Sequence, residues 1–104
     1  MTKDSKWIKV DGMRILDLLL VVSKYPNGRW GMLAIDAETG EPDTVITVNL
    51  NEDLSDSEFF VRRETERYSP EIFSFFENNR IAERTGRVVS AGYVENYAEV
   101  WRLC

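Results

Sequence analysis

Histidine is absent from this sequence of 104 residues, and cysteine occurs once, at Cys104. Without histidine there is no Ser-His or Cys-His nucleophile pair, no imidazole base at neutral pH and no histidine metal ligand. A single cysteine can form neither an internal disulfide nor a zinc site. A small enzyme would be left with carboxylate, lysine or tyrosine chemistry. We therefore expect a non-enzymatic protein with no metal site and no cofactor.

The sequence also lacks a long hydrophobic run. The longest, residues 18–22, is far shorter than the roughly 18 residues that a membrane span needs, and residues 1–9 lack the apolar centre of a secretion signal. Together with the lone cysteine, this favours a cytoplasmic protein that does not contact a membrane. The apolar share of 43% and the charged share of 30% are typical of a globular protein, and the length predicts a single domain, residues 1–104.

Two apolar segments in the middle of the chain, residues 30–36 and 43–50, are rich in the branched and aromatic side chains that are typical of strands. The turn between them contains Gly40, where a positive φ is needed. This pattern predicts an antiparallel hairpin at the centre of a sheet.

The residues before this hairpin also predict strands. Residues 6–10 precede Asp11-Gly12, a dipeptide that favours a tight hairpin turn. Residues 14–24 could place apolar side chains on a helix face or on a strand face. The turn signal at residues 26–28 favours the strand. Because both of its faces are apolar, we expect this strand to be central.

The residues after the hairpin predict one helix and further strands. A polar excursion at residues 51–58 leads into a short edge strand at residues 59–61. Residues 85–87 predict a loop, and residues 88–103 predict one or two closing strands. The resulting fold class is α+β: an antiparallel β-meander sheet packed by one amphipathic helix, with a C-terminal strand or hairpin.

The helix has the clearest start signal in the chain, Ser69-Pro70-Glu71, which supplies an N-cap hydroxyl and a proline in the first turn. Ile72, Phe75 and Phe76 share the face that should cover the sheet, with Phe73 flanking it. Asn78 and Asn79 can adopt the left-handed conformation that ends a helix.

Acidic residues concentrate in the middle of the chain. Residues 30–61 hold eight acids and no base, whereas residues 1–29 hold six bases and three acids and residues 62–104 hold seven of each. A solvated surface that aids solubility is the simplest interpretation. The alternative is an acidic face that docks on the basic, nucleic-acid-binding surface of a partner protein. The candidate partner-binding residues are Glu52, Asp53, Asp56 and Glu58 in the excursion, and Glu38 and Glu41 at the hairpin tip, which should lie at opposite ends of the strand at residues 43–50.

Two other clusters could carry chemistry. Glu64 and Glu66 could act as an acid–base pair if they lay in different environments across a cleft. Arg80, Arg84 and Arg87 could hold a phosphate, although acidic residues lie among them and favour a solvated helix end and loop. The net charge of −5 argues against direct binding of nucleic acid.

Three segments resemble a small domain family of unknown function from phages, plasmids and conjugative elements. The segments are MLAIDAETGEPDTVITVNL, the FV at residues 60–61 and FFENNRIAERTGR, and their most specific parts are the TGEP turn at residues 39–42, the TVNL strand end at residues 47–50 and the TGR loop at residues 85–87. The chain departs from the family at Asn79-Arg80, where the family tends to have Asn-Gly. The resemblance implies a mobile-element setting, in which small acidic proteins often inhibit host defence nucleases.

These observations lead to one expected function and two alternatives. We expect an acidic protein of a mobile genetic element that inhibits a host nuclease system, of the anti-CRISPR or anti-restriction type, by docking on a basic effector protein. One alternative is an accessory or structural protein that self-associates, as a homodimer or larger assembly, through a sheet edge or exposed aromatics. The other is a small enzyme.

Overall fold

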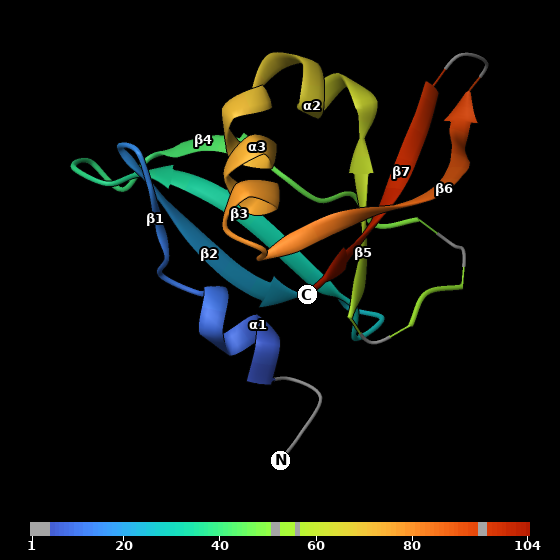
Figure 1. Cartoon of the computed structure of the whole chain (residues 1–104), viewed down its shortest axis with the longest axis horizontal. Helices are drawn as coiled ribbons and strands as arrows, with labels where there is room; N and C mark the ends of the chain where they lie inside the picture. Colours follow the sequence, from blue (N-terminus) through green and yellow to red (C-terminus); the bar gives the residue numbers. More distant parts are fainter. Residues whose placement is uncertain (1–4, 51–52, 56, 94–95) are drawn as a thin grey trace.

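The computed structural model describes residues 5–50, 53–55, 57–93 and 96–104 and shows an α+β fold with two antiparallel sheets. Sheet A has the order β1-β2-β3-β4, and sheet B has the order β5-β7-β6 (Figure 1). The strands of sheet A are β1 (Arg14–Ile15), β2 (Leu18–Lys24), β3 (Trp30–Asp36) and β4 (Pro42–Val45). Sheet B consists of β5 (Glu58–Arg62), β6 (Ala82–Tyr93) and β7 (Asn96–Leu103). The helices are α1 (Ser5–Val10), α2 (Arg63–Tyr68) and α3 (Pro70–Asn78).

Sheet A is the predicted meander, with one change in the position of its hairpin. Strands β3 and β4 form the hairpin, and Gly40 has the expected positive φ of 76°. However, β4 ends at Val45 and lies at the edge of the sheet, so the prediction of a central hairpin holds for β3 and was wrong for β4. The central strands are β2 and β3, which pair along seven residues each.

The prediction of a hairpin at Asp11-Gly12 was wrong, because residues 5–10 form a helix rather than a strand. Trp7 and Val10 lie three residues apart, which places both on one face of α1, and both are buried. The ring of Trp7 stacks on the ring of Trp30, with 5.4 Å between the ring centroids. The local sequence does not predict this contact. The turn at Asp11-Gly12 therefore joins a helix to β1. The first hairpin among the described residues follows Ile15, where residues 16–17 connect β1 to β2 and divide the single strand predicted at residues 14–24.

Helix α3 begins where the sequence predicted, but its N-cap contact, its buried aromatic residues and the residue that ends it differ from the prediction. Ser69 is the N-cap residue, yet its hydroxyl makes no capping hydrogen bond and instead lies 3.4 Å from the Thr44 hydroxyl. Phe76 is fully buried as expected, whereas Phe75 is half-buried and Phe73 takes the second fully buried aromatic position. The residue in the left-handed conformation after the helix is Arg80, with φ of 54°, rather than one of the asparagines.

Sheet B contains the predicted edge strand and the predicted closing strands. Strand β5 pairs with β7, and β6 pairs with β7 on the other side. Residues 85–87 do not form a loop; they are a bulge within β6, where the register shifts between Arg84 and Val88 and Gly86 has a φ of 86°. Helix α2, which directly continues β5, was not predicted.

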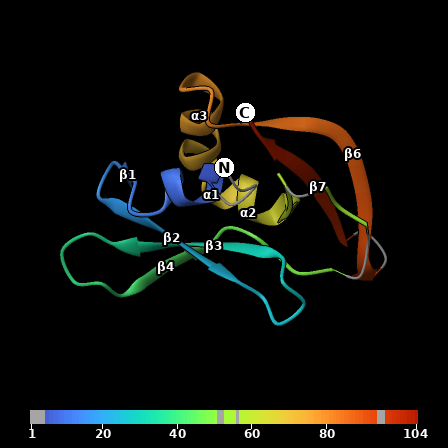
Figure 2. The ribbon, with the colours of Figure 1, turned by 90° about the horizontal axis from the view of Figure 1, so that it is seen from below.

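The main hydrophobic core lies between the two sheets and the helices. Figure 2 shows the helices and sheet B on the same side of sheet A. A smaller cluster on the other side of sheet B consists of Phe60, Ala98 and Val100 and is covered by Val48, Leu50 and Leu54. None of the described helices is long and apolar enough to cross a membrane. The main core consists of Trp7, Val10, Ile15, Leu20, Met32, Ala34, Ile46, Phe59, Val61, Ile72, Phe73, Phe76, Ala82, Trp101 and Leu103.

Candidate functional site

The loop between β3 and β4 is shaped by the carboxylate of Asp36. This carboxylate accepts hydrogen bonds from the backbone N–H groups of Glu38 and Thr39, at 2.8 and 3.0 Å. The same bonds, Thr39 first, hold the pKa of Asp36 below its ordinary value. Asp36 is therefore ionised at neutral pH and stabilises the loop. Glu38 and Glu41 are exposed in the same loop.

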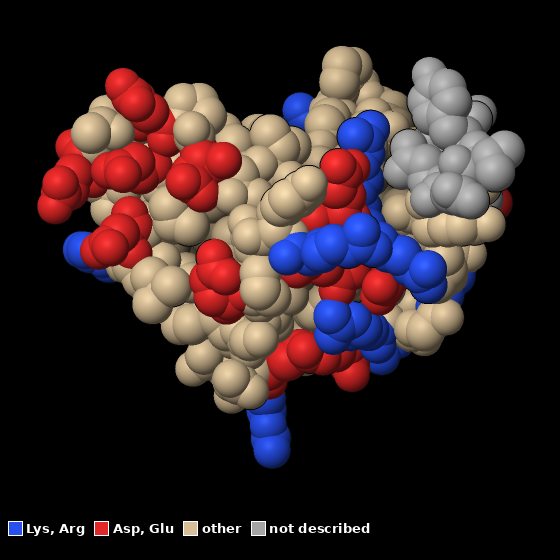
Figure 3. Space-filling view, turned by 90° about the horizontal axis from the view of Figure 1, so that it is seen from above, with Lys and Arg blue, Asp and Glu red and all other residues tan. Residues whose placement is uncertain are grey.

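Acidic side chains gather at this end of the molecule. The Ala37 N–H donates to the Asp17 carbonyl at 2.8 Å, so the turn between β1 and β2 lies beside the loop. Figure 3 shows the acidic side chains clustered at the end where the hairpin projects. Among the described ion pairs this end takes part in one, between exposed Arg14 and Asp17 at 3.8 Å. We name this surface the acidic tip: Asp17, Asp36, Glu38, Glu41 and Asp43.

The acids of the excursion do not join the acidic tip. The excursion lies at the opposite end of β3, where Arg29 donates to the Leu50 carbonyl at 2.8 Å. Arg87 donates to the Asp53 carbonyl at 2.8 Å, and the half-buried Glu58 carboxylate accepts from the Ser55 N–H at 2.8 Å. Arg29 and Arg87 thus hold the backbone just before the excursion and within it, through carbonyl oxygens rather than carboxylates. Glu52 and Asp56, two of the candidate partner-binding residues, lie outside the described residues.

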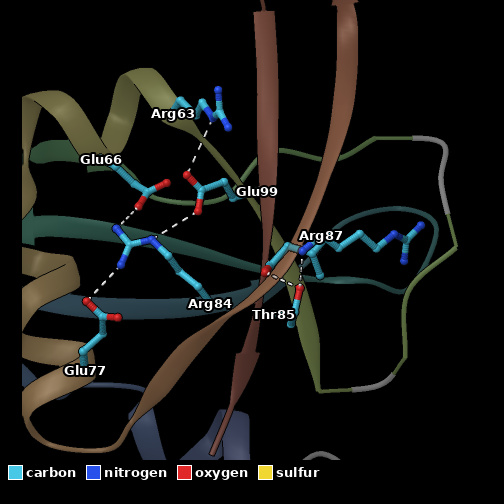
Figure 4. Close-up of polar contacts among 8 residues, drawn as sticks. Arg63, Glu66, Glu77, Arg84, Thr85, Arg87 and Glu99 are labelled. Carbon is cyan, nitrogen blue, oxygen red and sulfur yellow. Dashed lines mark hydrogen bonds and ion pairs between the residues drawn. The ribbon is translucent and has the colours of Figure 1, made fainter.

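A second charged cluster joins the helices to sheet B. The guanidinium of Arg84, in β6, contacts carboxylates from three elements: Glu66 of α2, Glu77 of α3 at 3.0 Å and Glu99 of β7 at 3.2 Å (Figure 4). It also lies 4.7 Å from the centre of the Trp101 ring. Because ion pairs to three elements converge on one side chain, this Arg84 cluster fixes α2 and α3 against sheet B.

Glu66 is the most perturbed acid of the Arg84 cluster. Its side chain is 10% exposed, and burial, followed by the hydrogen bond to Glu99 and the charge of Glu99, raises its pKa to about 7 although Arg84 acts in the opposite direction. One oxygen of Glu66 is buried without a hydrogen-bond partner in the described structure, and a proton on that oxygen would provide a donor. Burial therefore keeps the Glu66 carboxyl partly protonated near neutral pH, with a pKa of about 7.

The Arg84 cluster lacks the surroundings of a catalytic acid pair. Four surface hollows of about 270, 320, 470 and 440 Å³ are lined by other residues, and none of the four includes Glu66, Arg84 or Glu99. Glu66 and Glu99 both pair with Arg84, whereas Glu64 is exposed on α2. The acid–base pair considered from the sequence therefore does not form.

The arginines near Gly86 do not converge on one site. Arg84 is occupied by three glutamates, and Arg87 reaches the excursion. The described residues contain no group of three or more acids, histidines or cysteines that could hold a metal ion. The sequence offered one signal for the Arg84 cluster: Glu99 falls between Tyr97 and Trp101 on one face of a strand, where a charged side chain needs a partner.

Comparisons of the chain with protein-family models, with curated proteins and with solved structures find no match. The resemblance to the mobile-element family stays a prediction.

Proposed function

We propose that this chain is a non-enzymatic binding protein that docks through its acidic tip on a basic, nucleic-acid-binding surface of a partner protein. The observation that supports the proposal best is the gathering of five acids at one end of sheet A, from two neighbouring turns and the strand ends beside them, where one described ion pair, between Arg14 and Asp17, is present. Carboxylates spaced around a projecting loop can imitate phosphates and steer a basic partner toward the loop.

Exposed apolar side chains close to the acidic tip favour a protein as the partner. Leu16, which is 67% exposed, precedes Asp17 in the turn between β1 and β2. Tyr68 is 76% exposed and lines a hollow of about 320 Å³ together with Asp43. Protein interfaces combine exposed aromatic side chains with a polar rim, whereas nucleic acid would be repelled by the acids.

The partner that we propose is an effector of a host defence nuclease system. The chain would inhibit this effector, as anti-CRISPR and anti-restriction proteins do, and would be encoded by a mobile genetic element. Such effectors hold nucleic acid in basic grooves, which an acidic loop can occupy. The TGEP turn, part of the family resemblance, lies within the hairpin loop that forms the acidic tip.

A binding experiment with matched charge reversals tests this proposal. The tagged chain is used to capture proteins from lysates of bacteria that carry a restriction or CRISPR system. The double variant Glu38→Lys, Glu41→Lys reverses two exposed acids of the tip. The control for comparison, Asp53→Lys, Glu83→Lys, reverses one exposed acid of the excursion and one exposed acid of β6, which pairs with Arg102 at 3.1 Å. We expect the tip variant to lose a nuclease effector that the wild type and the control both retain.

The salt dependence of the same capture gives a second measurement. Screening shortens the reach of charges to about 8 Å at physiological ionic strength, so capture should decline steadily as salt rises. Capture that survives the tip variant, or that is lost only in the control, would refute the tip as the docking surface and return the interface to the excursion.

A further inference from the structure

A hollow of about 320 Å³ lies between α2 and β4, the edge strand of sheet A. Glu64 and Tyr68 are four residues apart on α2, which places both side chains on the same face of the helix. Strand β4 contributes Asp43 to the same hollow. The hydroxyl groups of Thr44 and Ser69, 3.4 Å apart, connect β4 to the end of α2. We name this surface the Tyr68 hollow; its lining includes Asp43, Thr44, Glu64, Thr65, Tyr68 and Ser69.

The ring and the carboxylates of the Tyr68 hollow are open to a ligand. Tyr68 is 76% exposed, and no cation or aromatic ring among the described residues lies against it. Glu64 is exposed and takes part in no ion pair with a described residue. Asp43 accepts a hydrogen bond from the neighbouring Thr44 hydroxyl at 2.7 Å, which leaves its other carboxylate oxygen for a further donor. The face of a tyrosine ring attracts a cation, as the two carboxylates do.

Elsewhere in the chain the same combination of groups holds an arginine. Arg63 lies 5.6 Å from the centre of the Tyr97 ring, and its Nε is 3.7 Å from a carboxylate oxygen of Glu99. Arg84 lies 4.7 Å from the centre of the Trp101 ring and is surrounded by three carboxylates. In both places an arginine covers an aromatic ring beside a glutamate. The hollow beside α2 has the ring and the carboxylates of this arrangement, but no described arginine covers its ring.

We propose that the Tyr68 hollow binds an arginine side chain that projects from the basic partner protein. In this site the guanidinium lies on the Tyr68 ring, and its N–H groups donate to the carboxylates of Asp43 and Glu64. The hydroxyl groups of Thr65 and Ser69 are further acceptors for its five N–H donors. Arginine fits better than lysine, because its planar and weakly hydrated group can both stack and donate in pairs. The identity of the partner rests on the proposed function, whereas the arginine site can be tested without the partner.

Arg62 sets the balance of charge in the Tyr68 hollow. It is exposed at the end of β5 and lines both this hollow and the neighbouring one of about 440 Å³. It forms no described ion pair with Asp43 or Glu64, and it does not lie over the Tyr68 ring. Two carboxylates against one guanidinium leave the hollow negative, and Asp43 connects it to the acidic tip. Removal of the Arg62 charge should therefore strengthen the binding of an arginine.

Titration with N-acetylarginine amide, followed by amide NMR spectra of the labelled protein, tests the site. At tens of millimolar, this probe should shift the signals of Thr65, Tyr68 and Ser69. N-acetylcitrulline amide, which has nearly the same shape but no charge, should not shift them. Tyr68→Ala should weaken binding of the arginine probe by at least about threefold, because the ring contact is lost. Tyr97→Ala is the matched control and should bind like the wild type, since Arg63 already covers that ring.

The variant Arg62→Gln tests the contribution of charge and should bind the arginine probe about twofold more tightly than the wild type. Equal shifts with the arginine and citrulline probes, or a Tyr68→Ala variant that binds as tightly as the wild type, would overturn the arginine site. The capture experiment separates this site from the proposed function. Binding of the arginine probe without capture of any nuclease effector would refute the proposed function alone. Capture that Tyr68→Ala leaves unchanged would show that the partner places no arginine in the hollow.

Discussion

Replacing Glu66 with glutamine should change how the stability of the protein depends on pH. Glu66 is held between Arg84 and Glu99, and its pKa is raised to about 7, with burial as the largest cause. A carboxyl whose pKa is raised in the folded state stabilises the fold while it is protonated. That stabilisation is complete below the unfolded pKa of 4.5 and is lost as the pH rises through about 7. Glutamine cannot ionise, so the variant should not show this loss.

The size of the effect follows from the two pKa values. A rise from 4.5 to about 7 corresponds to at most about 3 kcal/mol between the fully protonated and the fully ionised folded protein. Arg84 is 43% exposed, and solvent around it screens part of this interaction. We therefore expect the free energy of unfolding of Glu66→Gln to gain about 2 kcal/mol relative to wild type between pH 5 and pH 8.

Urea unfolding followed by tryptophan fluorescence at several pH values measures this difference. The fluorescence reports folding because Trp7 and Trp101 are fully buried. Glu64→Gln is the matched control, since it makes the same chemical change on an exposed residue of the same helix. If Glu66→Gln and wild type show parallel pH profiles from 5 to 8, then the pKa of Glu66 is not raised in the folded protein and the reasoning is wrong.

Three further substitutions test the fold, each through the free energy of unfolding in urea. Phe76→Ala should cost about 3 to 5 kcal/mol, because Phe76 is fully buried in the main core, and a loss below about 1 kcal/mol would contradict the packing of α3. Gly40→Val should cost roughly 1 kcal/mol or more, because a β-branched residue is strained at φ of 76°; unchanged stability would refute that conformation. Arg80→Gly should stabilise the protein by up to about 1 kcal/mol, because Arg80 occupies the left-handed conformation at φ of 54°; destabilisation would show that its exposed side chain contributes more than the backbone strain.

Patterns of a few adjacent residues predicted those parts of the fold that depend only on neighbouring residues. The turn at Gly40 and the start of α3 at Pro70 each depend on a few adjacent residues, and both occur where the sequence placed them. Asp11-Gly12 illustrates the limit of such rules. Gly12 does adopt a positive φ, but it follows a helix whose apolar residues are fixed by distant partners such as Phe59.

The missed elements depend on contacts between distant residues. The sequence of α2, RETERY, has no apolar period, and its helix is held by ion pairs from Arg63 to Glu99 and from Glu66 to Arg84. The division into two sheets likewise depends on β5 pairing with β7, about forty residues later. No local pattern specifies either partner.

The placement of the acidic side chains was predicted in part. The sequence identified two groups of acids at opposite ends of a strand, and the structure places the described ones at opposite ends of β3. It could not show that Arg29 and Arg87 bind the carbonyl oxygens of Leu50 and Asp53, because those contacts span 21 and 34 residues.

The most direct test of the proposed function is inhibition of a defence nuclease in cells. Plasmid transformation is measured in bacteria with an active restriction or CRISPR system that express the wild type, the tip variant Glu38→Lys, Glu41→Lys or the control Asp53→Lys, Glu83→Lys. If the acidic tip occupies the basic groove of the nuclease effector, the wild type and the control should raise the transformation of targeted plasmid by at least about tenfold, and the tip variant should not. If all three proteins raise plasmid transformation equally, the acidic tip is not the inhibitory surface. If the wild type does not raise transformation in any such system, the proposed inhibitory function is wrong.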